Sequence, residues 1–217
     1  MADFFIKQWK ALCLLFISAA WIGLLPVWSS WITENPLDEP ISLDPPGQII
    51  KEIETRIPEN FDFDLVFSRQ GQAFEEVKRL VGDMGVCVPP SRCSKGVAVP
   101  ISWSLTSLET SRIVSSGNVM TIDSHGWSGA DVFRSISKIH VPTGRYLFRA
   151  DILKSVPELS HIKTRLQISI GGKSASTWQM GLVWWGALGQ VLVAWPLGAY
   201  ALFLLLRAGL TGIAKRQ

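Results

Sequence analysis

The residues with the clearest chemical potential lie around a glycine-rich stretch, Gly126-Trp127-Ser128-Gly129. A serine between glycines, with His125 and Asp123 close by, is similar to the nucleophile elbow of serine hydrolases. The elbow needs a second glycine two residues after its serine, and this chain has Ala130 there. Closeness along a loop also does not assemble a catalytic triad. We therefore interpret the stretch first as a turn, second as part of a binding surface, and last as a hydrolase site.

Two cysteines, Cys87 and Cys93, bracket the loop Val88-Pro89-Pro90-Ser91-Arg92. One pair of thiols without a nearby histidine cannot complete a tetrahedral zinc site. Arg92 comes one position too early for the Cys-x5-Arg signature of phosphatases. In an oxidising compartment such a pair closes into a disulfide. We therefore predict a Cys87–Cys93 disulfide, with two free thiols as the alternative.

Motifs that would hold a cofactor or a metal ion are incomplete. The stretch Gly171-Gly172-Lys173-Ser174 is similar to the end of a phosphate-binding loop, but the first glycine of that motif would fall at Gln167. The three histidines, His125, His140 and His161, have no metal-ligand spacing among them. We therefore predict no catalytic residue, no cofactor and no metal site.

The whole sequence is 47% hydrophobic and 18% charged, and two long uncharged runs, residues 11–31 and 179–206, must position the rest of the chain. A helix needs about 20 apolar residues to span a bilayer, so both runs are predicted to be transmembrane helices. A cleavable signal peptide is the alternative for the first run, although this run is longer than the usual apolar region of such peptides. A buried core helix is the alternative for the second.

The second run also contains residues that shape helix packing. Pro196 is expected to kink the helix, and four glycines would let another helix approach closely. Contact between copies of the chain is one use of such a face, so a homo-oligomer stays open. The glycines are Gly181, Gly186, Gly189 and Gly198.

The charge distribution predicts the orientation of these helices. Residues 32–178 hold 16 Lys and Arg against 17 Asp and Glu, although the whole chain is +3. By the positive-inside rule the tails, residues 1–10 and 207–217, are cytoplasmic, and the middle lies in the periplasm at a bacterial inner membrane. The positive charge gives no support for nucleic-acid binding. The basic residues outside the middle segment are Lys7, Lys10, Arg207, Lys215 and Arg216.

The middle segment is predicted to be mostly β. Residues 32–60, rich in Pro and acid, are expected to form an extended stalk, and residues 172–178 a linker. From Phe61 to Phe67 apolar residues alternate with acids as in a half-buried strand, and a short amphipathic helix should follow and end at Gly82. Six or seven strands over residues 61–171 predict an immunoglobulin-like antiparallel β-sandwich. The further strand-like segments are 96–108, 111–122, 132–141, 144–153 and 162–170.

Several motifs of this domain occur in an order that resembles a known family. They are Phe61-Asp62-Phe63-Asp64-Leu65-Val66-Phe67, Lys78-Arg79-Leu80-Val81-Gly82, Val99-Pro100-Ile101, Pro142-Thr143-Gly144-Arg145-Tyr146 and Leu153-Lys154-Ser155-Val156-Pro157-Glu158-Leu159. The family is a proteobacterial group catalogued as domain of unknown function 5625, and the resemblance covers about residues 61–170. It implies an exported, membrane-tethered domain. Members are often lipoproteins, and some are associated with secreted antibacterial effectors.

The resemblance carries over no catalytic residue, and this chain departs from the lipoprotein pattern. Cys13 lies inside an unfinished apolar run rather than at a lipidation signal, so a helix is expected to replace the lipid. Together these observations predict a membrane-anchored, periplasmic protein-binding module.

We expect this module to be an immunity protein that binds a secreted toxin. Loops on a rigid domain commonly carry recognition, and Arg92, His125 and Trp127 are the residues predicted to contact the partner. The alternative is a structural or assembly subunit of an inner-membrane complex. A second, weaker alternative is a periplasmic hydrolase using Ser128, His125 and Asp123.

Overall fold

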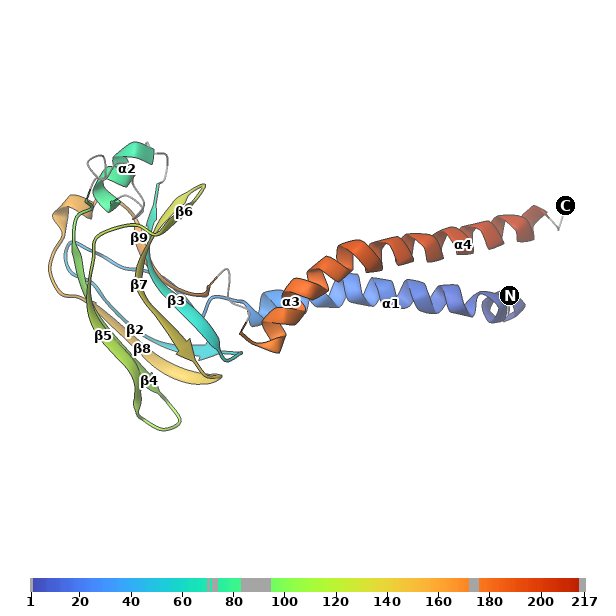
Figure 1. Ribbon diagram of the computed structural model, residues 1–217, viewed down its shortest axis with the longest axis horizontal. Helices are drawn as coiled ribbons and strands as arrows, with labels where there is room; N and C mark the ends of the chain where they lie inside the picture. The colour runs from blue at the N-terminus through green and yellow to red at the C-terminus, as the bar shows by residue number, and fades with distance from the viewer. Residues whose placement is uncertain (1, 70, 72–73, 83–94, 172–175, 215–217) are drawn as a thin grey trace. The chain divides into compact units, whose positions relative to one another are not determined.

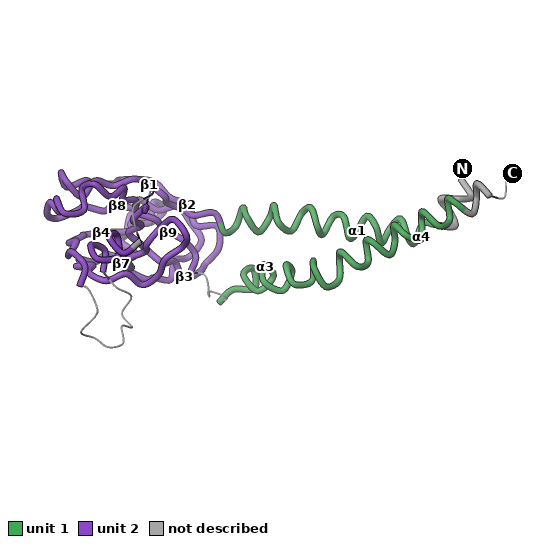
Figure 2. Tube along the Cα trace, turned by 90° about the horizontal axis from the view of Figure 1, so that it is seen from above, with its two compact units in different colours: residues 1–33, 175–217 green, residues 34–174 purple. Residues whose placement is uncertain are grey.

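The computed structural model describes residues 2–69, 71, 74–82, 95–171 and 176–214. The chain divides into two compact units, shown in different colours in Figure 2. The helical unit contains Met1–Thr33 and Ala175–Gln217, and the two-sheet unit contains Glu34–Ser174.

Among the described residues of the two-sheet unit, nine strands form two antiparallel sheets (Figure 1). The five-stranded sheet has the order β1-β9-β3-β7-β6, and the four-stranded sheet has the order β2-β8-β4-β5. The prediction of a mostly β domain with antiparallel strands is confirmed. The strands are β1 (Leu37–Pro40), β2 (Gln48–Thr55), β3 (Glu59–Ser68), β4 (Val99–Ser107), β5 (Ile113–Thr121), β6 (Gly126–Ser128), β7 (Asp131–Val141), β8 (Gly144–Ile152) and β9 (Thr164–Ile170).

One apolar core lies between the two sheets. On β3 the alternation predicted from the sequence is observed, because Phe61, Phe63 and Leu65 all face inward and are buried. The ring of Phe63 packs edge-on against Trp103 of β4 and Phe148 of β8, with centroid distances of 5.1 and 5.6 Å. Since β3 belongs to one sheet and β4 and β8 to the other, these contacts join the two sheets.

The stalk predicted for residues 32–60 is wrong. Within this segment β1 pairs with β9 and β2 pairs with β8, and Ile49 and Ile53 of β2 are buried in the shared core. Proline excludes a segment from the centre of a sheet but not from its edge, and Pro40 is the last residue of the edge strand β1. The proline and acid content therefore indicated edge strands rather than an extended chain.

The short helix α2 (Phe74–Val81) confirms the predicted amphipathic helix. Its inward side chains Val77 and Val81 are buried in the core, and Glu75 and Glu76 lie in its first turn. Gly82 follows with φ of +93°, a backbone conformation that side chains with a Cβ rarely adopt. The N–H of Gly82 donates to the carbonyl of Lys78 at 2.8 Å, so the helix ends where predicted.

The helical unit contains α1 (Ala2–Ile32), α3 (Trp178–Gly189) and α4 (Trp195–Ala214), with a π-helical turn at Gln190–Ala194 between the last two. The segments Gln8–Ile32 and Trp178–Leu210 are long and apolar enough to cross a membrane. The π-helical turn comes directly before Pro196, which cannot donate a backbone hydrogen bond to the preceding turn. A kink was predicted at this proline, and the structure has a π-helical turn shortly before it.

Both helices extend beyond the predicted spans. Helical structure also covers most of residues 1–10 and continues from 207 to Ala214, within the segments predicted to be cytoplasmic tails. Residues 215–217 of the predicted tail, and residues 172–175 of the predicted linker, lie outside the described residues.

Glycines of the second apolar segment pack against α1 of the same chain. A Cβ on Gly186 would lie 2.9 Å from a methyl carbon of Leu25, and one on Gly198 would lie 3.3 Å from the Cβ of Ser18. A Cβ on Gly181 would meet nothing within 4 Å. Because higher numbers on one helix pair with lower numbers on the other, the two helices run antiparallel, as Figure 1 shows.

Candidate binding surface

The stretch that first suggested chemistry forms a β-hairpin with an exposed aromatic residue. Trp127 lies on β6, which pairs with the beginning of β7, and 59% of its surface is exposed. Arg69, directly after β3, fixes the turn of this hairpin. Its backbone N–H donates to the carbonyl of Ala130 at 2.8 Å, and its Nη1 donates to the carbonyl of Gly129 at 3.0 Å. The hairpin thus presents Trp127 from a hydrogen-bonded support.

His125 is attached to both β7 and β3. Its backbone N–H donates to the carbonyl of Phe133 at 2.9 Å, and its ring stands edge-on to the Phe133 ring at a centroid distance of 6.4 Å. Its Nε2 lies 3.9 Å from Oδ1 of Asp64. The carboxylate beside His125 is therefore that of Asp64 on β3 and not that of Asp123, which the hydrolase interpretation would need.

Asp64 is buried on the outward side of β3, and its Oδ1 has no hydrogen-bond partner among the described residues. Burial raises the pKa of this carboxyl to about 7, and the charge of Asp62 adds to the rise while Lys138 opposes it. Close to neutral pH the group can therefore hold or release a proton next to His125. The contact between His125 and Asp64 links the segment before Trp127 to β3.

Arg134 of β7 is fully buried in the two-sheet unit, and its guanidinium donates to backbone carbonyls of three segments. Nε and Nη2 donate to the carbonyl of Val81 at 2.7 and 2.5 Å, at the end of α2. Nη1 donates to the carbonyl of Val97 at 2.7 Å and to that of Thr121 at 3.3 Å. Burial lowers the pKa of Arg134 to about 10, while Asp123 opposes the shift, so this side chain stays charged.

The contacts of Arg134 fix both ends of the segment that contains the two cysteines. Val81 precedes this segment and Val97 follows it, and Arg134 binds the carbonyls of both. The backbone at position 96 lies close to Arg134 and to the end of α2. This position requires glycine, because a Cβ there would collide with Nη2 of Arg134 and with the carbonyl of Val81. Cys87, Cys93 and Arg92 themselves lie outside the described residues.

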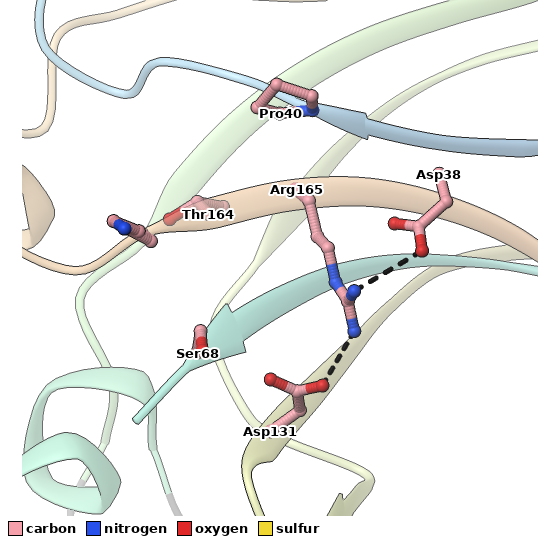
Figure 3. A pocket seen from close by; sticks show the side chains of 7 residues that line it. Asp38, Pro40, Ser68, Asp131, Thr164 and Arg165 are labelled. Carbon is pink, nitrogen blue, oxygen red and sulfur yellow. Dashed lines mark hydrogen bonds and ion pairs between the residues drawn. The ribbon is translucent and has the colours of Figure 1, made fainter. Parts of the chain in front are cut away.

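A shallow pocket of about 310 Å³ lies at the start of β7, next to the hairpin (Figure 3). The guanidinium of Arg165 lies between two carboxylates, with Nη1 3.3 Å from Asp38 and Nη2 2.6 Å from Asp131. These ion pairs connect β1, β9 and β7. Two carboxylates neutralise Arg165, and the pocket wall also includes Ser68 and Lys163.

The structure brings only part of the predicted site together. His125 and Trp127 lie on one loop and hairpin, as their closeness in the sequence implied, and Ser128 ends β6 opposite Asp131. Sequence reasoning missed Asp64, Arg134 and Arg165. Asp64 was interpreted as a solvent-facing member of an alternating strand. The sequence does contain an indication for Arg134, because it occupies an inward position in the alternating pattern of β7. A charged residue at such a position needs hydrogen-bond partners.

The fold and the hairpin define the class of protein. It is a mostly β protein with two antiparallel sheets, two long apolar helices and an exposed tryptophan, Trp127, on a hairpin. The chain belongs to the family described as "Domain of unknown function (DUF5625)", which it matches over residues 38–170. The match confirms the family resemblance seen in the sequence. It also begins within β1, in agreement with the observation that residues before Phe61 are part of the folded domain.

The chain is similar in fold to a solved structure. It is the crystal structure of GEBA250068378 from Sulfurospirillum deleyianum, with a TM-score of 0.52 and 18% sequence identity. The alignment covers 64% of this chain and 99% of that chain. At this identity the likeness shows the fold alone. No curated protein matches the chain.

Proposed function

We propose that this protein is a two-pass protein of the bacterial inner membrane with its two-sheet unit in the periplasm. Large apolar side chains on both helices are exposed in the folded chain, among them Phe16 at 74% and Trp185 at 73%. Such extensive apolar surface is unfavourable in water and favourable in lipid. Because the helices are antiparallel, Lys7, Lys10 and Arg207 lie toward the same end of the pair, which supports cytoplasmic termini.

We propose that the two-sheet unit is a protein-binding module, and the observation that carries this proposal is the exposed Trp127 on its fixed hairpin. An exposed indole on a rigid support binds a partner with little loss of conformational freedom, and tryptophan is enriched at the centres of interfaces. His125 lies on the same loop, beside Asp64. The partner we favour is a secreted antibacterial effector, which makes the protein an immunity protein.

A photo-crosslinking amino acid at position 127 tests this proposal, with the same amino acid at Ile50, an exposed residue of β2, as the matched control. We expect position 127 to capture a protein that Ile50 does not capture. The captured protein should be toxic when exported to the periplasm, and co-expression of the wild-type chain should prevent this toxicity while the Trp127→Ala variant should not. Equal capture at both positions, or full protection by Trp127→Ala, would contradict the proposal.

The assembly-subunit alternative rests on the helical unit, where three glycines are used for packing inside the chain and Gly181 faces open space. Replacing residues 8–32 and 178–210 with unrelated membrane-spanning helices separates the two functions. Protection that survives the exchange supports the binding module. Lost function, with normal membrane insertion and a folded two-sheet unit, supports assembly.

We also propose that Cys87 and Cys93 form a disulfide. Arg134 and Gly96 hold the two ends of their segment near each other, which is the arrangement that a closed loop needs. Alkylation of the unfolded protein before and after reduction, read by mass spectrometry, tests this. We expect both cysteines to become modified only after reduction, and modification before reduction would contradict the bridge.

The two-sheet unit is, we propose, an immunoglobulin-like sandwich that uses aromatic residues in place of the inter-sheet disulfide. If β2, β3, β4, β5, β7, β8 and β9 correspond to strands A to G, the pairs β3–β7 and β4–β8 correspond to B–E and C–F. Trp103 then occupies strand C, and Phe63 and Phe148 face each other from strands B and F. The outer pairs differ, because β2 pairs with β8 and β9 with β3.

A tyrosine supports this correspondence. Tyr146 lies two residues before Phe148, near the start of β8, and its hydroxyl donates to the carbonyl of Pro142 at 2.8 Å. This is the position and the bond of the tyrosine corner of immunoglobulin-like domains. An experimental structure in which Phe63, Trp103 and Phe148 lie apart would contradict the proposal.

A further inference from the structure

The described edges of the two sheets are protected to very different degrees. An exposed edge strand can pair with another chain, and proteins prevent this with short strands, prolines or charged residues. The edge strand β1 has four residues and ends in Pro40, and β6 has three residues. The edge strand β2 is longer, but it carries Lys51, Glu52 and Glu54. Each of these three edges has a recognisable protection.

The edge strand β5 has none of these three protections, and its pairing with β4 is regular except for one register shift opposite Val114, near its start. It is nine residues long, and its sequence IVSSGNVMT contains no charged residue and no proline. Among the described residues β4 is its one strand neighbour, so half of its backbone N–H and C=O groups point away from the sheet. Two apolar side chains at its ends are largely exposed, Ile113 at 66% and Met120 at 61%.

The sequence of β5 is complementary to itself in one antiparallel register. When two copies pair about Gly117, Ser116 faces Asn118 of the other copy, and Val114 faces Met120. All four residues are exposed, with no charge on any of them. Polar residues therefore meet polar residues, and apolar residues meet apolar residues, twice across the symmetry axis. An isologous contact of this kind closes into a dimer and leaves no further β5 edge free.

The helical unit offers less for self-association than its sequence suggested. Three glycines of the second apolar segment, Gly186, Gly189 and Gly198, face α1 of the same chain. The glycine face that could have packed against a second copy is therefore covered by α1. The unprotected edge of β5 is thus the better candidate for a contact between copies.

We propose that two copies of this chain pair through antiparallel β5 strands, centred on Gly117, to form one continuous eight-stranded sheet. The occupant of the β5 edge is a second β5. This proposal does not depend on the membrane location or on the partner of the Trp127 hairpin, because the contact lies within the two-sheet unit alone.

Charge substitutions on the exposed side of β5 test both the contact and its register. Ser116→Lys with Asn118→Lys places lysine opposite lysine at two points of the dimer. Ser116→Lys with Asn118→Glu places lysine opposite glutamate at the same two points. The neighbours of these residues on β4, Ser104 and Ser102, are uncharged, so both variants should fold alike.

The measurement is the mass of the full chain in detergent micelles, by light scattering over a concentration series, with circular dichroism as the control for folding. We expect a dimer for the wild type, a dissociation constant raised about tenfold or more for the double-lysine variant, and recovery of the dimer in the lysine–glutamate variant. A monomeric wild type, an unchanged dimer in the double-lysine variant, or no recovery with glutamate would each overturn the proposal.

Discussion

The two units of this protein place their large apolar side chains in opposite ways. In the two-sheet unit Phe63, Trp103 and Phe148 are buried between the sheets. In the helical unit Phe16, Leu24 and many others are exposed. A composition of 47% hydrophobic residues, averaged over the chain, hides this difference. The comparison teaches that exposure has to be judged for each unit separately, and the proposed membrane location of the helical unit accounts for the difference.

The largest expected effect concerns the buried charge of the two-sheet unit. Arg134→Met removes a guanidinium that donates to four backbone carbonyls, so these carbonyls lose the hydrogen bonds that Arg134 supplies. We expect the free energy of unfolding of this unit to fall by about 3–5 kcal/mol. Chemical unfolding of the full chain in detergent, followed by tryptophan fluorescence, measures it. Arg149→Met, which removes only a surface ion pair with Asp151, is the control and should destabilise the unit far less than Arg134→Met.

The next effect compares two exposed apolar residues, one from each unit. Leu24 of α1 is 68% exposed and Ile50 of β2 is 55% exposed. Leu24→Lys places a charge in the proposed membrane span and should cost insertion about 2–3 kcal/mol, whereas Ile50→Lys should cost nothing. The fraction of each variant that resists carbonate extraction from membranes reports insertion. Equal behaviour of both variants would mean that the units share one solvent.

A smaller effect concerns the acid beneath His125. The folded-state pKa of Asp64 is raised to about 7, above its unfolded value near 4, so the folded protein binds the additional proton between these values. Stability therefore falls as pH rises through this window. Asp64→Asn removes the dependence and should stabilise the protein by about 2 kcal/mol at pH 8, with no gain below about pH 4.

Asp151 provides a control of opposite sign. Its hydrogen bond with Arg149 lowers its pKa, so Asp151→Asn should destabilise the protein at pH 8, and the difference should shrink as pH falls through the acid range. Thermal unfolding at several pH values compares both variants. A destabilised Asp64→Asn protein at pH 8 would contradict the burial of this carboxyl.

The smallest effect concerns packing inside the helical unit. Gly186→Ile inserts a side chain at a position where even a Cβ would lie 2.9 Å from Leu25. This substitution should weaken the helix pair by about 1–2 kcal/mol. Gly181→Ile inserts the same side chain where nothing lies within 4 Å and should have no such effect. Resistance of the helix pair to separation by sodium dodecyl sulfate, followed by energy transfer between labels at both ends, measures the difference.

Periodicity was sufficient to predict most of the fold. The alternation in β3, the helical spacing around Val77 and the glycine at position 82 are local signals, and the structure agrees with each. The strands before Phe61 were missed because their proline and acid content, which suits an edge, was interpreted as a stalk. Pairing of β1 with β9 is a contact between distant parts of the chain, which no local pattern specifies.

The surface was less predictable than the fold for the same reason. His125 and Trp127 are neighbours in sequence, so their shared loop could be foreseen. The contact of His125 with Asp64 joins residues far apart in the chain, and so does the contact of Arg134 with Val81. Both depend on strand register, and register is set by the whole sheet.

The most direct test of the central claim is the side of the membrane on which the two-sheet unit lies. In a chain whose native cysteines are replaced by serine, single cysteines at Trp127 and at Lys10 are treated with a membrane-impermeant maleimide in cells with a permeabilised outer membrane. We predict labelling at position 127 while the inner membrane is intact, and labelling at position 10 only after it is broken. Labelling at position 127 only after the inner membrane is broken would contradict the account.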